Sequence, residues 1–240
     1  MPTVITEVDP QLATVTAPTS PAATGFDPAA PALAELDRQV RAYLEAGVAS
    51  LLGLDEAGLT ELVAPLRAAV ERDGTSWHHE PGKEDDDVDF LLVLRTPDIN
   101  DAVPAMRRGA KAGVSVIDRE EIVTYLPVEG VEVPDVDAYL LTGIDAGSEF
   151  LNVRPEDALA TVRERGRTPL TIAEGVALAT VRPDRLRPNR CFSLMGSRTG
   201  TNQRVPAVWI SERRPKLGWC WDRNPHTWLG AASASARIVA

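Results

Sequence analysis

The side chains best suited to ligand chemistry gather near the C-terminus. Four of the five tryptophans, from Trp209 to Trp228, lie within twenty residues, and arginines are interleaved with them. An indole face stacks on planar groups and cations, and a guanidinium pairs with anions. The pattern predicts a site for a small anionic or planar ligand, or for an acidic segment of a partner protein. We expect it to be lined by Arg190, Arg198, Arg204, Trp219, Trp221, Arg223, His226 and Trp228.

The arrangement of these residues on a strand limits their roles. Residues two apart on a strand share a face, so Trp219 and Trp221 are expected together and Cys220 on the opposite face. In the ligand-binding hypothesis, Arg198 and Arg204 pair with the anion while the two indoles stack on it. Large rings also fill hydrophobic cores, so a purely structural role for the tryptophans is the alternative.

The segment from Gly196 to Arg204, which reads GSRTGTNQR, precedes a predicted strand. Its glycines, hydroxyls and guanidiniums suit a backbone concavity that binds anions. It is not a Walker A loop, because the glycine spacing differs and no lysine follows. A solvated hairpin loop is the alternative interpretation.

Cys220 and His226 indicate a second class of function, an enzyme with a thiolate nucleophile and its base. This hypothesis competes with the first, because tryptophans that face solvent would bury the Cys220 thiol. Adding Cys191 still leaves fewer than the four ligands of a structural zinc site, and no C-x-x-C pair occurs. The acidic run at 84–87 lacks the EF-hand spacing, although His78 and His79 lie near it. We therefore predict no metal site, and the sequence names no cofactor.

Charge is distributed unevenly along the chain. The net charge is -10, yet residues 182–240 carry 11 basic and 3 acidic side chains, a net of +8. Attraction between this basic part and the acidic remainder of the same chain is one explanation, and an anion site is the other. The overall negative charge argues against nucleic acid as a partner.

The chain shows no signal for secretion or membrane insertion. Its first residues lack the basic start and apolar stretch of a signal peptide, and its apolar runs are far shorter than a bilayer-spanning helix. Two cysteines are too few for a disulfide framework. We expect a cytoplasmic protein that does not enter membranes.

Apolar spacing and turn residues predict the elements that position these side chains. We expect helices at 28–53, from 56 to 74, at 155–165 and from Thr171, where Thr171 and Glu174 form a capping box. Strands are expected at 88–95, 114–117, 122–126, 139–144, 191–195, 205–211 and 217–221. Separate runs of helices and strands favour an α+β fold with an N-terminal α-hairpin, a mixed or antiparallel sheet and a Trp-rich β region at the C-terminus.

The expected organisation has three parts. Residues 1–27 are rich in Pro, Thr and Ala, which predicts a disordered tail. Residues 28–74 form the helical hairpin, and 88–240 form an α+β domain that joins the hairpin in one unit or stands apart from it. A third functional hypothesis follows, in which the protein is an interaction or scaffold protein and its tail binds a protein partner.

Three phrases carry a resemblance to a known family: GRTPLTIAEGVAL at 166–178, CFSLMGSR at 191–198, and VPAVWIS with PKLGWCWDRNPHTWLGAAS up to Ser233. From about Tyr139 to Ser233 the chain resembles a family of actinobacterial proteins known only as a domain of unknown function. The resemblance implies no activity, cofactor or catalytic residue.

Overall fold

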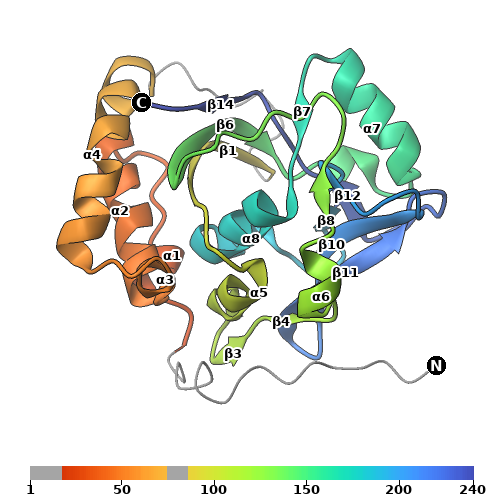
Figure 1. The fold of residues 1–240 in the computed structure, drawn as a ribbon, viewed down its shortest axis with the longest axis horizontal. Helices are drawn as coiled ribbons and strands as arrows, with labels where there is room; N and C mark the ends of the chain where they lie inside the picture. The colour runs from red at the N-terminus through yellow and green to blue at the C-terminus, as the bar shows by residue number, and fades with distance from the viewer. Residues whose placement is uncertain (1–17, 75–85) are drawn as a thin grey trace.

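The computed structural model describes residues 18–74 and 86–240 and shows an α+β fold. Helices near the N-terminus form one side of the molecule, a sheet built largely from the C-terminal quarter forms the other, and α8 lies between them (Figure 1). Residues from all three parts share one hydrophobic core, which includes Leu36, Leu92, Leu178 and Phe192. No helix of the described ranges has the length and apolar character needed to cross a bilayer.

The N-terminal side consists of α1 (Pro21–Thr24), α2 (Ala32–Glu45), α3 (Val48–Leu51) and α4 (Glu56–Asp73). Helix α4 begins after Asp55, whose carboxylate accepts a hydrogen bond from the Gly58 amide at 2.8 Å. It packs against α2, which confirms the predicted α-hairpin. The single helix expected at 28–53 is divided, because Gly47 adopts a left-handed conformation with φ of 76° between α2 and α3.

The predicted disordered tail is too long. Residues 18–27 are ordered: Ser20 caps α1, and the Phe26 ring lies 3.5 Å from the guanidinium carbon of Arg182. Ala23 of α1 is buried in the core and α1 packs against α2, which gives this Pro- and Ala-rich segment an apolar surface. Residues 1–17 lie outside the described part of the chain.

The first sheet has the order β1–β6–β13–β7, with β14 also pairing with β6. Its strands are β1 (Asp87–Leu94), β6 (Ala138–Asp145), β7 (Thr168–Pro169), β13 (Ser233–Ala234) and β14 (Ala236–Ile238), and all its pairings are antiparallel. Strand β1 is an edge strand, but α2 covers part of its edge. The Gln39 side chain bonds to Phe90 O and Leu92 N, and the Tyr43 hydroxyl donates to Leu92 O.

The second sheet has the order β12–β8–β10–β11–β4 and is mixed. Its strands are β4 (Val114–Ser115), β8 (Cys191–Ser193), β10 (Arg204–Ser211), β11 (Arg214–Trp221) and β12 (Leu229–Ala231). Strands β8 and β10 are antiparallel neighbours joined by residues 194–203, as the sequence predicted. Within this connection β9 (Ser197–Arg198) pairs with β5 (Leu126–Pro127).

The remaining helices are α5 (Ile99–Ala102), α6 (Arg119–Ile122), α7 (Pro155–Glu164) and α8 (Ile172–Val181), with short 3-10 turns at Val103–Ala105, Ser148–Phe150 and Pro183–Arg185. A two-stranded ribbon joins β2 (Arg107–Arg108) to β3 (Lys111–Ala112). The strand predicted at 122–126 is wrong. Asp118 caps a short helix there by accepting from the Glu121 amide at 2.7 Å, and this local bond outweighs the strand preference of the apolar residues that follow.

Helix α8 is central because it contacts both sheets. Its capping box is present as predicted: Thr171 accepts from the Glu174 amide, and the Glu174 carboxylate accepts from the Thr171 amide at 2.7 Å. A Cβ on Gly175 would lie 2.2 Å from Leu194 Cδ2, so any other residue here would force the buried Leu194 side chain to shift.

Candidate functional site

Trp219 and Trp221 share one face of β11, as their spacing predicted. In the β10–β11 register Arg204 lies opposite Trp221 and Pro206 lies opposite Trp219. The two indoles meet edge to face with centroids 5.1 Å apart, and the Arg204 guanidinium carbon lies 4.1 Å from the Trp219 ring centroid. Trp221 is the more accessible of the two, with 47% of its surface exposed.

Three of the four arginines of the predicted anion site, Arg198, Arg204 and Arg223, already have protein partners. Arg204 Nη1 lies 2.6 Å from Glu121 Oε1, and Arg223 Nε lies 3.3 Å from Glu156 Oε2. Arg198 Nη1 donates to the carbonyl oxygens of Met195 and Ser197, and burial lowers the pKa of its guanidinium. Arg190 is exposed in the turn that follows Arg187, and the amide of the next residue, Cys191, donates to Trp228 O at 3.0 Å. Much of the positive charge in this region is therefore balanced within the chain.

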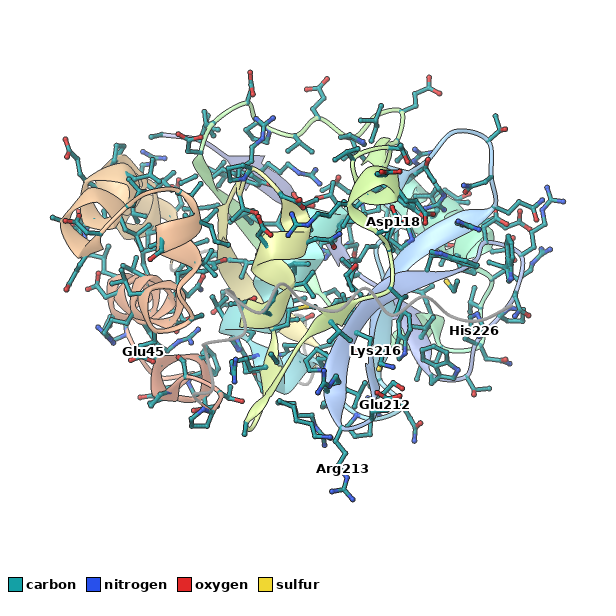
Figure 2. The ribbon with its side chains drawn as sticks, turned by 60° about the horizontal axis from the view of Figure 1, so that its bottom comes forward. Glu45, Asp118, Glu212, Arg213, Lys216 and His226 are labelled. Atoms are coloured by element: carbon teal, nitrogen blue, oxygen red, sulfur yellow. The ribbon has the colours of Figure 1, made fainter. Side chains whose placement is uncertain are left out.

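The predicted cluster is divided between the two faces of the second sheet. The register places Trp209 on the face of Gly218 and Cys220, opposite to that of Trp219. Trp228 packs against Trp209 with ring centroids 6.2 Å apart, and the His226 ring lies 5.2 Å from that of Trp228. Figure 2 shows His226 near one end of the molecule. Trp228 and His226 thus belong to a different surface from Trp219 and Trp221.

The environment of Cys220 does not suit a nucleophile. Its thiol is buried on the face opposite the two indoles, and burial raises its pKa to about 12. Within the described residues no hydrogen bond connects Cys220 with His226, and burial lowers the pKa of the His226 imidazole. A reactive cysteine needs a lowered pKa and access to solvent, which this geometry does not provide.

A cavity of about 570 Å³ lies elsewhere, at the N-terminal end of α8. Its wall combines residues from β1, α5, α6, β5, β6, α8 and β9 with the loops beside them, and half of these residues are apolar. The apolar residues are Val93, Pro97, Ile99, Ile122, Val123, Pro127, Val133 and Ala173. Val123 is 68% exposed, so the cavity has an apolar residue at its accessible margin. Sites for small molecules have this character: apolar walls and a few fixed polar groups.

The polar side chains that line the same cavity include those of Tyr139, Thr171 and Ser197. Ser197 Oγ accepts from the Ile172 amide at 3.1 Å, at the start of α8. Tyr139 and Thr171 both donate to the Glu174 carboxylate, at 2.9 Å each. Burial is the main cause of a strongly raised pKa at the Tyr139 phenol, which therefore stays protonated. These groups can orient a ligand by hydrogen bonds, but none of them is a general base at neutral pH.

A buried ion pair fixes this polar part of the wall. Arg237 Nε lies 2.6 Å from Glu174 Oε1, and Arg237 Nη2 lies 2.9 Å from Glu174 Oε2. The same guanidinium donates to Thr168 Oγ1 at 2.7 Å. The carboxylate that holds Tyr139 and Thr171 is therefore itself held from two directions, which limits rotation of the side chains that face the cavity.

Tyr125 connects the cavity to the predicted Trp surface. Its ring lines the cavity, and its hydroxyl donates to Glu121 Oε1 at 3.2 Å. That same oxygen accepts from Arg204, which in turn stacks on Trp219. The sequence signals for Trp219 and Arg204 thus point to residues one layer behind the cavity wall, not to the wall itself.

Sequence reasoning missed the cavity residues because they come from segments scattered between 93 and 197. Two recognised signals lie on the wall, namely the capping box at Thr171 and the segment from Gly196 to Arg204, which contributes Ser197. At the margin Arg95 pairs with Asp135, while Arg119 pairs with Asp98 and Asp101. Within the described ranges no cluster of three or more His, Cys, Asp or Glu side chains is arranged to hold a metal ion.

Fold and cavity together define an α+β protein with a space of small-molecule size beside its central helix. The chain belongs to the DUF5701 family, a family of unknown function whose model matches residues 42–240. The match begins far earlier than the resemblance at 139–233 suggested, and it includes every residue that lines the cavity. No curated protein and no solved structure matches the chain.

Proposed function

We propose that this protein binds a small molecule in the cavity at the N-terminal end of α8. The observation that carries the proposal is the cavity's volume of about 570 Å³ together with its apolar wall. Cavities of roughly 300–1,000 Å³ hold most small-molecule ligands. Ser197 and the start of α8 lie at the polar part of the wall, so the ligand has an apolar or planar body and a hydrogen-bonding group.

The ligand we propose carries little or no net charge where it meets the cavity. The charged residues on the wall are Arg95, Asp98 and Asp135, and each has an ion-pair partner within the chain. A ligand ion would have to compete with these existing pairs. The sequence predicted an anionic or planar ligand at the Trp-rich region, whereas for the cavity we propose a planar or apolar one.

Native mass spectrometry of freshly purified protein tests the proposal. We expect extra mass that is lost on denaturation, or saturable binding of an uncharged apolar fluorescent dye such as N-phenyl-1-naphthylamine by the folded chain. Ala173→Phe fills the cavity from α8 and should abolish both signals. Ala68→Phe places the same ring on the exposed face of α4 and serves as the control. Equal dye binding by wild type and Ala173→Phe would place the ligand elsewhere.

A second candidate is binding of a planar group or an acidic partner segment on Trp221, Trp219 and Arg204. The exposure of Trp221 and the cation–π contact of Arg204 favour it. Trp221→Ala would remove this binding and leave dye binding in the cavity unchanged, so the two candidates are separable.

The remaining hypotheses from the sequence concern catalysis by Cys220, a protein partner of the N-terminal segment, and the location and source of the protein. We do not propose a thiol enzyme, because the Cys220 thiol is buried and its pKa is raised. Binding of a protein partner through residues 1–27 stays a proposal, and residues 1–17 of that segment lie outside the described part. A cytoplasmic location and an actinobacterial source are likewise proposals from the sequence. Neither bears on the cavity.

A further inference from the structure

Arg107 is a buried cation with unused hydrogen-bonding capacity. It lies on β2 with only 5% of its surface exposed, and its Nη2 donates to Ala110 O at 3.0 Å. Its Nε and Nη1 have no hydrogen-bond partner among the described residues. A guanidinium presents its donors in a planar fork, and burying such a group without partners is costly.

No carboxylate compensates this charge in the described part of the chain. Burial lowers the pKa of the Arg107 guanidinium, and no carboxylate opposes that effect. Asp184 lines the same cavity as Arg107, but it accepts from Arg182 at 2.9 and 2.8 Å and lies 3.2 Å from Arg185 Nε. Its charge is therefore already balanced by two other arginines.

Arg107 lines a second cavity, of about 250 Å³. Arg108 and the side chains of Thr19 and Thr24 line it as well, and Ala179 contributes the C-terminal part of α8. The first cavity lies at the opposite end of this helix, beside Thr171 and Ala173. The two spaces are thus separate, and the smaller one has excess positive charge.

We propose that the smaller cavity binds a phosphate-type oxyanion, either inorganic phosphate or the phosphate group of an ester, with Arg107 as its principal partner. The planar fork of Arg107 matches the geometry of phosphate oxygens, and Arg108 adds a second positive charge. Both unused N–H groups are shielded from water in this conformation, so binding includes a turn of the Arg107 side chain towards the cavity. This site is independent of the small-molecule cavity proposed above.

Titration calorimetry with inorganic phosphate at constant ionic strength tests the proposal. We expect saturable binding to the full-length wild-type protein and at least a tenfold weaker affinity for Arg107→Met. This variant should fold, because replacing an uncompensated buried cation by an apolar side chain of similar length is neutral or stabilising. Arg41→Ala, which removes an exposed arginine of α2, is the matched control and should bind as the wild type does.

Thermal unfolding of the same proteins supplies a second readout. Phosphate stabilises many folded proteins through its exclusion from their surfaces, so the difference between wild type and Arg107→Met is decisive. We expect a larger increase in Tm on adding phosphate for the wild type and for Arg41→Ala than for Arg107→Met. Tighter binding of glycerol phosphate than of inorganic phosphate would identify an ester as the ligand. Equal affinities of wild type and Arg107→Met, no saturable phosphate binding, or unfolding of Arg107→Met without phosphate would each overturn the proposal.

Discussion

Glu174 and Arg237 form a bidentate ion pair across 63 positions of sequence, with N–O distances of 2.6 and 2.9 Å. The Glu174 side chain is fully buried and that of Arg237 is 7% exposed. Because Arg237 lies on β14 near the C-terminus and Glu174 lies in the first turn of α8, the pair attaches the last strand to the central helix. It also holds the hydroxyls of Tyr139 and Thr171 at the cavity wall.

Removing Arg237 should destabilise the whole fold. Arg237→Met leaves the buried Glu174 carboxylate without its cation, and we expect a loss of about 3–5 kcal/mol in the free energy of unfolding. Urea denaturation followed by circular dichroism measures it. Adding Glu174→Gln to this variant should recover part of the loss. A single variant as stable as the wild type would show that the pair contributes nothing.

Gln39 should contribute more to the free energy of unfolding than a single polar side chain on a helix normally does. Its amide bonds to Phe90 O at 3.0 Å and to Leu92 N at 2.7 Å, so it takes the place of a neighbouring strand at the edge of β1. Gln39→Leu leaves both buried groups without partners, and we expect a loss of about 2–4 kcal/mol of stability in urea. The exposed Gln203→Leu should stay within about 0.5 kcal/mol of the wild type. Similar values for the two variants would contradict this role.

The turn between β10 and β11 has a backbone conformation that its two residues, Glu212 and Arg213, do not favour. Glu212 and Arg213 have φ of 54° and 64°, the positive values that a two-residue hairpin turn requires at both positions. Figure 2 shows Arg213 extending away from the protein, while Lys216 lies close to Glu212.

Replacing this pair by Asn-Gly should raise stability by about 1 kcal/mol, because both new residues tolerate positive φ. The Lys216–Glu212 ion pair that is lost contributes little, because its atoms lie 3.4 Å apart and the Glu212 side chain is 65% exposed. Thermal unfolding measures the gain. Lower stability of the Asn-Gly variant would indicate that the contacts of Glu212 outweigh the backbone strain.

The Cys220 thiol should resist alkylation in the folded protein. Its pKa of about 12 leaves almost no thiolate at pH 7–9, and its side chain is buried. Iodoacetamide labelling followed by mass spectrometry should detect modification of Cys220 only after urea is added. Cys191, which is also buried with a raised pKa, should behave in the same way. Rapid labelling of Cys220 in the folded chain would revive the thiol-enzyme hypothesis.

The raised pKa of the Cys220 thiol predicts that the stability of the protein depends on pH. The folded chain holds the Cys220 proton to higher pH than the unfolded chain, whose thiol has an ordinary value of 9.0. The unfolded state therefore loses its proton first, and stability falls as pH rises from about 9 towards 12. Cys220→Ala should reduce this dependence in urea titrations at pH 8, 9 and 10. An unchanged slope would show that other groups cause it.

Features that depend on neighbours in sequence were predictable. The N-cap of α4 at Asp55, the capping box at Thr171 and Glu174, and strands β1, β6, β10 and β11 all follow from residue types and spacing. The opposite directions of Trp219 and Cys220 follow from strand geometry alone. In each case the cause lies within a few residues, so the sequence carries the whole signal.

Features that depend on packing were decided by the tertiary structure. The sequence could not show that Glu121 of α6 neutralises Arg204, that Trp228 packs on Trp209 instead of joining Trp219, or that Gln39 completes the edge of β1. Nor could it show the cavity, whose wall is assembled from distant segments. Periodicity determines which way a side chain points from its own element, whereas its partners depend on which other elements lie opposite, and that is fixed only when the core is packed.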